Sequence, residues 1–377
     1  GRTSGAADDP RALYYELENL ALEHTLNGHD DWLWGVSYSP DGARLVTGSG
    51  HLNVPEGDNS VRLWDAITGQ PIAVLEGHED TVPAVDFHPD GNTLASGSWD
   101  GTVIVWNVTP SLPNPVRIST LEVSESRVND VDFSPDGDVL LTASSDGILR
   151  LFNARTLDLI REIKAHDGRA LRAKFGPEGD VIASAGTDSL VKLFNTRTGD
   201  ELRTFTGHTG WVSTVNFNSD GTLLVSGADN DLIVWDVDAA EGEEIERVLV
   251  GHQGFVYGGD FSPDDRYVLS GASDTTVRLW EVATGEEIRR FDDHTNWILD
   301  VEFSPDGTQA VTAAEDNTAR VWRIAPSTEA LVEWVNVNRY VPELTCDQRE
   351  RYNVEPLCDA LDGGEGRGRE GRSGAED

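Results

Sequence analysis

The feature that most constrains the fold of this chain is one sequence unit that occurs seven times. In each unit an aromatic residue ends a short apolar run, at intervals of 42, 46, 42, 41, 45 and 42 residues. These residues are Trp64, Trp106, Phe152, Phe194, Trp235, Trp280 and Trp322. A fixed period of this length is the signature of a repeat fold, in which every unit packs on its neighbours. A chain of 377 residues can then form one continuous structure and need not divide into separate globular cores.

Two further landmarks recur inside every unit. Six units begin with a His, and the third has Ser124 in that position; the histidines are His29, His78, His166, His208, His252 and His294. Nine residues later an aromatic residue precedes a tight turn such as SPDG, in which Pro fixes φ and Gly supplies positive φ. A β-branched or Leu-rich stretch, an Asp and the final apolar run follow. Each unit therefore predicts strand, turn, strand, turn, strand.

The order GH, SPDG, SGSxD and then WD or WN at this spacing resembles the WD-repeat family over roughly residues 22–324. The resemblance implies an all-β fold: a seven-bladed β-propeller with four-stranded blades around a central channel. In that family each repeat supplies the outer strand of one blade and three inner strands of the next. We therefore expect residues 22–26 to complete the blade that ends at Trp322.

Four segments are expected along the chain. Residues 1–21 form an N-terminal segment, 22–324 the propeller, 325–362 a helical C-terminal extension and 363–377 a disordered tail of Gly and charged residues. The run NRYVPELTCDQRERYNVEPLC resembles the tail that follows WD repeats in bacterial multidomain signalling proteins. The resemblance, together with the lack of any Met, implies the C-terminal part of a larger signalling polypeptide.

The charge and hydropathy of the chain exclude some classes of binding partner. Sixty-seven acidic against 29 basic residues give a net charge of −38, which repels a phosphate backbone, so no nucleic acid is expected. The acidic surface fits either a salty environment or basic partners. No apolar run is long enough to span a bilayer. Both cysteines lie outside the repeats, and with no signal pattern at residues 1–10 a cytoplasmic location is expected.

Each unit carries a His, a Ser or Thr and an Asp, the residue types of a hydrolase triad. A set that recurs at constant spacing indicates a structural device, because an active site needs one constellation in one pocket. The resemblance implies a buried hydrogen-bonded tetrad in each complete unit, and the clearest are His78, Ser96, Asp100 and Trp106; His252, Ser270, Asp274 and Trp280; and His294, Thr312, Asp316 and Trp322. The fifth unit also holds all four types, as His208, Ser226, Asp229 and Trp235. No motif for a metal, a phosphate or a nucleophile occurs, so no catalytic residue and no cofactor are assigned.

The resemblance also places a binding surface. In the family the third and fifth residues after the His, and the residue before the turn Asp, lie at the channel rim on the top face. Those positions hold Trp32, Trp34, Trp99, Arg127, Arg169, Trp211, Phe255, Tyr257 and Trp297. Large aromatics beside Arg are enriched in protein-binding hot spots. The same side chains could instead pack on neighbouring loops and cap the channel.

Three functions remain open. The sequence favours a non-enzymatic scaffold or sensor module that binds proteins or peptides through the top face. The alternative is a propeller enzyme, of hydrolase or lactonase type, with its site in the central channel. That alternative needs converging acidic or His side chains, whereas the rim positions hold mostly aromatic or small residues. A purely structural role in an assembly is the third.

Overall fold

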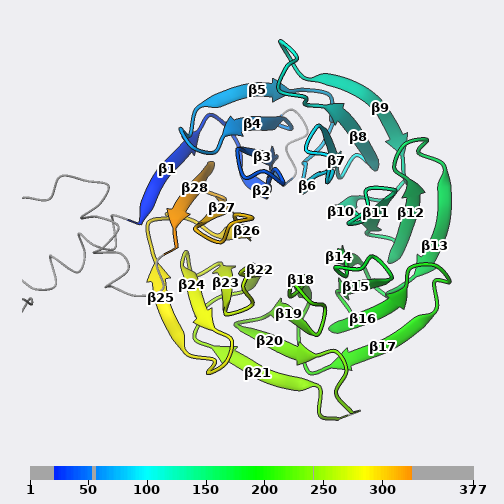
Figure 1. The fold of residues 1–377 in the computed structure, drawn as a ribbon, viewed down its shortest axis with the longest axis vertical. Coiled ribbons are helices and arrows are strands. Elements are labelled where there is room, and N and C mark those ends of the chain that lie inside the picture. The colour runs from blue at the N-terminus through cyan, green and yellow to red at the C-terminus, as the bar shows by residue number, and fades with distance from the viewer. Residues whose placement is uncertain (1–20, 53–56, 241, 325–377) are drawn as a thin grey trace, which may run out of the picture. The chain divides into compact units, whose positions relative to one another are not determined.

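The computed structural model describes residues 21–52, 57–240 and 242–324. These residues form seven antiparallel sheets of four strands, arranged as blades around a central axis (Figure 1). The innermost strands are β2 (Leu33–Tyr38), β6 (Ala84–Phe87), β10 (Val128–Phe133), β14 (Ala170–Phe175), β18 (Val212–Phe217), β22 (Val256–Phe261) and β26 (Ile298–Phe303). The second strands are β3 (Arg44–Ser49), β7 (Thr93–Gly97), β11 (Val139–Ser144), β15 (Val181–Gly186), β19 (Leu223–Ala228), β23 (Tyr267–Ala272) and β27 (Gln309–Ala314).

The remaining strands complete the blades outward. The third strands are β4 (Val61–Asp65), β8 (Thr102–Asn107), β12 (Ile148–Asn153), β16 (Leu190–Asn195), β20 (Asp231–Asp236), β24 (Val277–Glu281) and β28 (Thr318–Arg323). The outer strands are β5 (Pro71–Leu75), β9 (Val116–Glu122), β13 (Leu159–Lys164), β17 (Glu201–Thr206), β21 (Ile245–Val250), β25 (Glu287–Phe291) and β1 (Leu22–Asn27). We number the blades 1 to 7 by their innermost strands in chain order. The predicted all-β, seven-bladed propeller is confirmed.

The ring is closed by strands from the two ends of the repeat region. The first strand, β1, pairs antiparallel with β28, with Leu22 opposite Trp322 and Leu26 opposite Ala319. Blade 7 therefore consists of β26, β27, β28 and β1. The expected closure by residues 22–26 is confirmed. The helical extension and the tail predicted after residue 324 lie outside the described residues.

Apolar packing lies between the blades. Seven clusters of buried side chains each combine residues from two neighbouring blades, and the ring-closing cluster joins Leu26 and Val321 of blade 7 to Leu33 and Trp64 of blade 1. Close approach requires small residues on the second strands. A Cβ at Gly48 would lie 2.5 Å from the main-chain oxygen of Val82 in the next blade. A second strand such as β3 is therefore buried along its whole length, whereas an outer strand such as β5 is mostly exposed.

Removing β1 should destabilise the whole ring, because blade 7 loses its outer strand and Leu26 leaves the closing cluster. We expect deletion of residues 1–27 to lower the free energy of unfolding by at least about 3 kcal/mol relative to deletion of residues 1–20. Chemical denaturation of the two truncated chains measures the difference. Equal stabilities would show that the ring closes without β1.

Candidate functional site

The tetrads are hydrogen-bonded chains that run through the interior of the blades. In blade 6 the Trp280 indole N–H donates to Ser270 Oγ at 2.8 Å, and His252 contacts Ser270 through Nε2 at 2.8 Å and Asp274 through Nδ1 at 3.0 Å. The chains of His78, Ser96, Asp100 and Trp106, and of His294, Thr312, Asp316 and Trp322, have the same connectivity. The chain of His29, Thr47, Asp58 and Trp64 repeats it in blade 1.

Burial determines the charge states inside a tetrad. It lowers the pKa of His252 below its ordinary value, although the hydrogen bond to Asp274 acts in the opposite direction. Burial alone would raise the pKa of Asp274, but the hydrogen bonds from His252 and from the main-chain N–H of Gln253 outweigh it and hold that pKa below the ordinary range. A neutral imidazole thus donates to an ionised carboxylate. The hydroxyl of Ser270 is fully buried and engaged on both sides, so it is not placed to attack a substrate.

The incomplete units differ from the pattern in specific ways. In blade 3 the Thr142 hydroxyl is buried without a partner among the described residues, and Asp146 pairs with Arg150 at 2.8 Å. In blade 4 His166 joins Ser184 and Asp188, but Phe194 has no N–H to add. These two departures follow directly from the residue types.

The fifth unit does not form the complete tetrad that its residue types predict. His208 and Trp235 both bond to Ser226, but in the described part of the chain no hydrogen bond joins His208 to Asp229. Asp229 instead accepts from the Thr209 hydroxyl at 2.7 Å. The turn is one residue shorter than in the other units, and Asp229 itself adopts a positive φ of 49°. Burial lowers the pKa of His208 to about 4, with only the nearby charge of Asp229 acting against it.

The tetrads generate a graded stability prediction. We expect Asp274→Ala to destabilise the fold by about 2 to 4 kcal/mol, because it leaves a buried His without its acceptor. Asp146→Ala and Asp229→Ala should each cost less than half as much, since neither carboxylate bonds to a His. Equilibrium unfolding of the three variants makes the comparison, and equal losses would contradict the structural role assigned to the tetrads.

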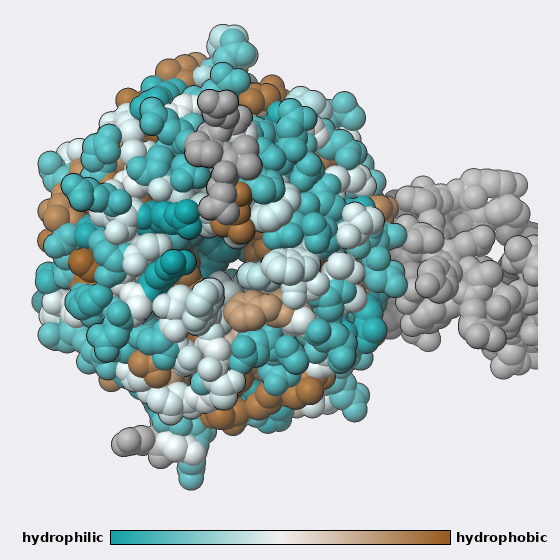
Figure 2. Space-filling model, turned by 180° about the vertical axis from the view of Figure 1, so that it is seen from behind, coloured by the Kyte–Doolittle hydropathy of each residue, from teal (hydrophilic) through white to brown (hydrophobic). Residues whose placement is uncertain are grey.

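The predicted binding residues gather at the top face, which we define as the end of the blades where each second strand turns into the third. In most blades the residue three after the His accepts a main-chain hydrogen bond from the residue before the turn Asp, as in Trp99 N to Thr81 O and Ser273 N to Phe255 O. This bond holds two of the three predicted positions side by side. Seen from behind Figure 1, the propeller is hollowed at its centre, and residues of intermediate hydropathy border the hollow among hydrophilic ones (Figure 2).

One group of top-face aromatics packs on itself and on the loop after β3. Trp34 meets Trp99 edge to face, with ring centroids 4.9 Å apart, and its indole N–H donates to the Gly50 carbonyl. Trp32 lies 4.3 Å from the ring of His51 in that loop. The Arg127 guanidinium stacks 4.3 Å above Trp99. These half-buried side chains pack on one another and on the loop after β3, as expected of residues that cap the channel.

A second group lies on blades 6 and 7 and is more open to solvent. Tyr257 stacks on Trp297 at a centroid distance of 6.0 Å and lies 5.0 Å from Phe255. Trp297 is 43% exposed, and Trp211 on blade 5 is 56% exposed. Arg169 of blade 4 is exposed as well. Trp211 and Trp297 are the two aromatics of the predicted set that leave large apolar surface in water.

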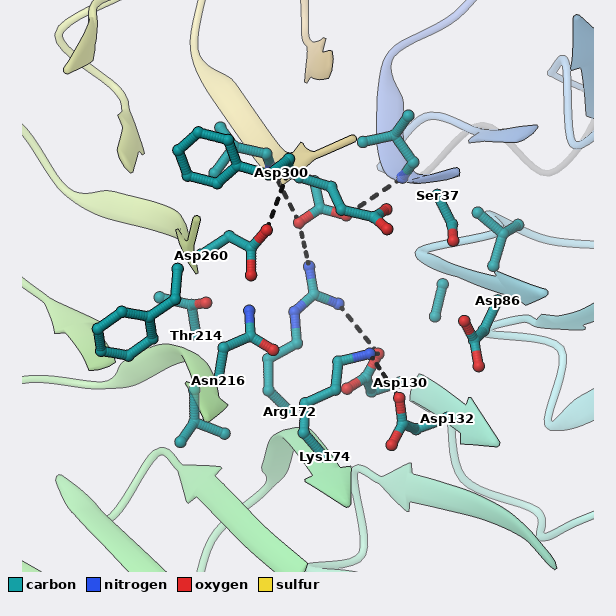
Figure 3. A pocket seen from close by; sticks show the side chains of 18 of the residues that line it. Ser37, Asp86, Asp130, Asp132, Arg172, Lys174, Thr214, Asn216, Asp260 and Asp300 are labelled. Carbon is teal, nitrogen blue, oxygen red and sulfur yellow. Dashed lines mark hydrogen bonds and ion pairs between the residues drawn. The ribbon is translucent and has the colours of Figure 1, made fainter. Parts of the chain in front are cut away.

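The central channel contains a set of charged side chains that the sequence interpretation missed. A cavity of about 320 Å³ is lined by six carboxylates and two cations, and Figure 3 shows several of them pointing into it. They are Asp86, Asp130, Asp132, Asp260, Asp300, Glu302, Arg172 and Lys174. The aromatic and small residues at the rim positions therefore do not represent the interior of the channel, which is charged. All eight occupy the sixth or eighth position after the His position of their unit. In blades 3, 4, 6 and 7, which supply seven of them, a β-bulge lies between the fourth and sixth positions and changes which residues face the channel.

Most of these carboxylates tie neighbouring blades together. Asp132 accepts the main-chain N–H of Phe175 at 2.8 Å, Asp260 that of Phe303 at 2.9 Å, and Glu302 that of Tyr38 at 3.2 Å. Lys174 lies 3.1 Å from Asp132, and Arg172 reaches across the channel toward Asp300 (Figure 3). Neighbouring innermost strands are thus joined through side chains.

Burial raises the pKa of several channel carboxylates. It raises the pKa of Asp260 to about 7, assisted by the charge of Asp300 and opposed by the hydrogen bond from Phe303. It also raises the pKa of Asp86 to about 7, with Asp132 adding to the effect and Lys174 opposing it. A raised carboxyl pKa stabilises the fold below the unfolded-state value, and that contribution is lost as pH rises through the folded-state value.

This linkage can be measured at a single position. Asp260→Asn keeps an oxygen for the Phe303 N–H but removes the charge. Raising the pH from 5 to 8 should therefore shift the stability difference in favour of the variant, by at least about 1 kcal/mol. Denaturant titrations at both pH values test this expectation. A stability difference independent of pH would show that Asp260 ionises normally.

Metal clusters and membrane-spanning helices are two features that would imply other functions. Among the described residues, no three His, Cys, Asp or Glu side chains lie close enough together to hold a metal ion. Over the same residues, no helix is long and apolar enough to cross a membrane.

The sequence of the chain matches the profile of one known protein family. The profile described as "WD40: WD domain, G-beta repeat" matches seven segments of the chain, one for each predicted unit. They are residues 20–65, 69–107, 115–153, 157–195, 199–236, 243–281 and 285–323. No curated protein matches the chain significantly.

Proposed function

Because this chain belongs to the WD40 repeat family, whose profile covers more than half of it, we propose that it binds proteins or peptides through its top face without catalysing a reaction. Propellers of this family are generally non-enzymatic interaction scaffolds. The observation that carries the proposal for this chain is the exposure of Trp211 and Trp297 at the same end of the blades. Large exposed aromatics are the side chains most often found as binding anchors.

The top face offers both a rigid and an accessible part. Trp34, Trp99 and Arg127 hold one another, so this side of the rim loses little conformational freedom when a partner docks. Trp297, backed by Tyr257, and the separate Trp211 supply apolar area that a partner can cover. A rim whose side chains are already fixed, next to exposed tryptophans that a partner can cover, favours binding because little conformational entropy is lost on docking.

The enzyme alternative receives less support from the same geometry. The acidic side chains that an enzyme would need are present in the channel. However, the carboxylates of Asp132, Asp260 and Glu302 accept main-chain hydrogen bonds from the next blade. The serine and threonine hydroxyls of the tetrads are buried. We therefore prefer the scaffold proposal, in which these groups stabilise the ring. The role within a larger signalling polypeptide remains part of this proposal.

Replacing Trp211 and Trp297 together by Ala tests the function. Neither belongs to a tetrad, so the propeller should stay folded, while partner binding should weaken by at least about 2 kcal/mol, or about thirtyfold in Kd. The partner is first isolated by affinity capture from cells that produce the protein, and wild type and variant are then titrated against it.

A matched control removes apolar surface elsewhere. Ile160 and Leu202 are 51% and 53% exposed on the outer strands β13 and β17. Replacing both by Ala should leave the affinity unchanged. If the double Trp variant folds and binds as wild type does, the binding surface lies away from these anchors. If it unfolds, the two tryptophans are structural caps.

A further inference from the structure

Glu315 is an acidic side chain that the sequence interpretation did not single out. It occupies the position before the tetrad Asp316, at the top of blade 7, and is only 8% exposed. Its main-chain N–H donates to the Trp297 carbonyl at 2.8 Å. Within the described part of the chain its carboxylate accepts no hydrogen bond, although the charge of His51 acts on it. The side chain is thus largely buried, while its carboxylate oxygens keep some contact with solvent and have no protein donor in the described part of the chain. A protein group that donated to them would add hydrogen bonds that the free propeller lacks.

Two aromatic residues are neighbours of Glu315 at the top of blades 6 and 7. Trp297 is linked to Glu315 through the main-chain hydrogen bond, and Tyr257 stacks on Trp297 with an interplanar angle of 23°. Burial raises the pKa of Tyr257, and the negative charge of Glu315 adds to that shift. The three residues therefore form one local group that combines π faces with an acid lacking a hydrogen-bond donor.

We propose that Glu315, Tyr257 and Trp297 bind the cationic side chain of a Lys or Arg on a peptide segment that docks on the top face. The inference rests on the function proposed above and specifies the partner's chemistry. An ammonium or guanidinium group supplies the missing hydrogen-bond donors to the carboxylate. The same cation is attracted to the faces of Trp and Tyr. One ligand group thus satisfies both features.

Charge over the rest of the chain favours the same ligand. The net charge is −38, and the adjoining channel holds six carboxylates against two cations. A basic segment is therefore attracted to this end of the propeller, whereas an acidic one is repelled. Among the described residues, the group whose charge acts against the raised pKa of Glu315 is His51, on the loop after β3. Asp316, the next residue along the chain, is already engaged by His294.

The pH dependence of binding follows from the state of Glu315. Burial raises the pKa of this carboxyl to about 7, with the charge of His51 acting in the opposite direction. A cation binds the ionised form, so affinity should rise as the pH increases through 7 and fall below it. His51 faces the same carboxylate, so the Glu315 contribution is the part of the pH dependence that disappears when Glu315 alone is changed.

The probe is a set of nonapeptides with uncharged, randomised flanks and one fixed central residue, Arg, Lys, Gln or Glu. Arrays of these peptides are incubated with the full chain, and the strongest sequences are titrated by fluorescence anisotropy at pH 8 and pH 6. The Arg or Lys peptides should bind at least about tenfold more tightly than their Gln or Glu counterparts at pH 8. Glu315→Gln should remove most of that preference and reduce the pH dependence.

Controls separate this inference from the function on which it rests. Glu178→Gln makes the same charge change in an exposed turn at the opposite end of blade 4 and should leave the cation preference intact. Trp297→Phe keeps a ring and should preserve part of the preference. If peptides bind through Trp211 and Trp297 regardless of their central charge, the cation site is wrong and the docking face survives. If no peptide binds, the cation site is wrong. If peptides bind but neither Glu315→Gln nor loss of the two tryptophans changes the affinity, both the cation site and the docking face are wrong.

Discussion

The pairing of β1 with β28 is the interaction on which the rest of this structure depends. It joins Leu22 to Trp322 across some 300 residues of chain and places Leu26 in the apolar cluster between blades 7 and 1. In a ring each blade packs on two neighbours. Loss of one strand therefore exposes the interface that it covers, and the remaining interfaces between blades are destabilised because the ring is no longer closed. The top face and the channel are each built from seven separate strands and exist only when the ring is closed.

Polar groups within the ring are held in opposite charge states. In the tetrads burial keeps the imidazole of His252 neutral, while hydrogen bonds keep Asp274 ionised. In the channel burial favours the protonated forms of Asp86 and Asp260 near neutral pH. The difference comes from the number of donors around each carboxylate: an acid with several donors stays charged, and an acid with few retains a proton. Glu315 belongs to the second class, which is why a cationic ligand would change its state.

Much of the fold could be predicted from the sequence, because the repeat supplies the same evidence seven times. The spacing of His, turn and aromatic residue predicted seven units of strands and turns. The resemblance of these units to the WD-repeat family then implied the blades, the closure by residues 22–26 and the tetrads. Asp229 escaped prediction because one missing residue changes how its turn is built. The channel carboxylates escaped because a bulge breaks the period-2 count after the fourth position. The burial of Glu315 depends on packing between blades, which no local pattern encodes.

The central claim is that partners bind at the end of the blades that carries Trp211, Trp297 and Glu315. Hydrogen–deuterium exchange of the propeller with and without a bound partner or peptide tests it most directly. The account predicts slower exchange in the segments that begin the innermost strands and in the turns between second and third strands, above all on blades 5, 6 and 7. Slower exchange confined to the SPDG-type turns at the opposite end, or to the outer strands, would contradict it.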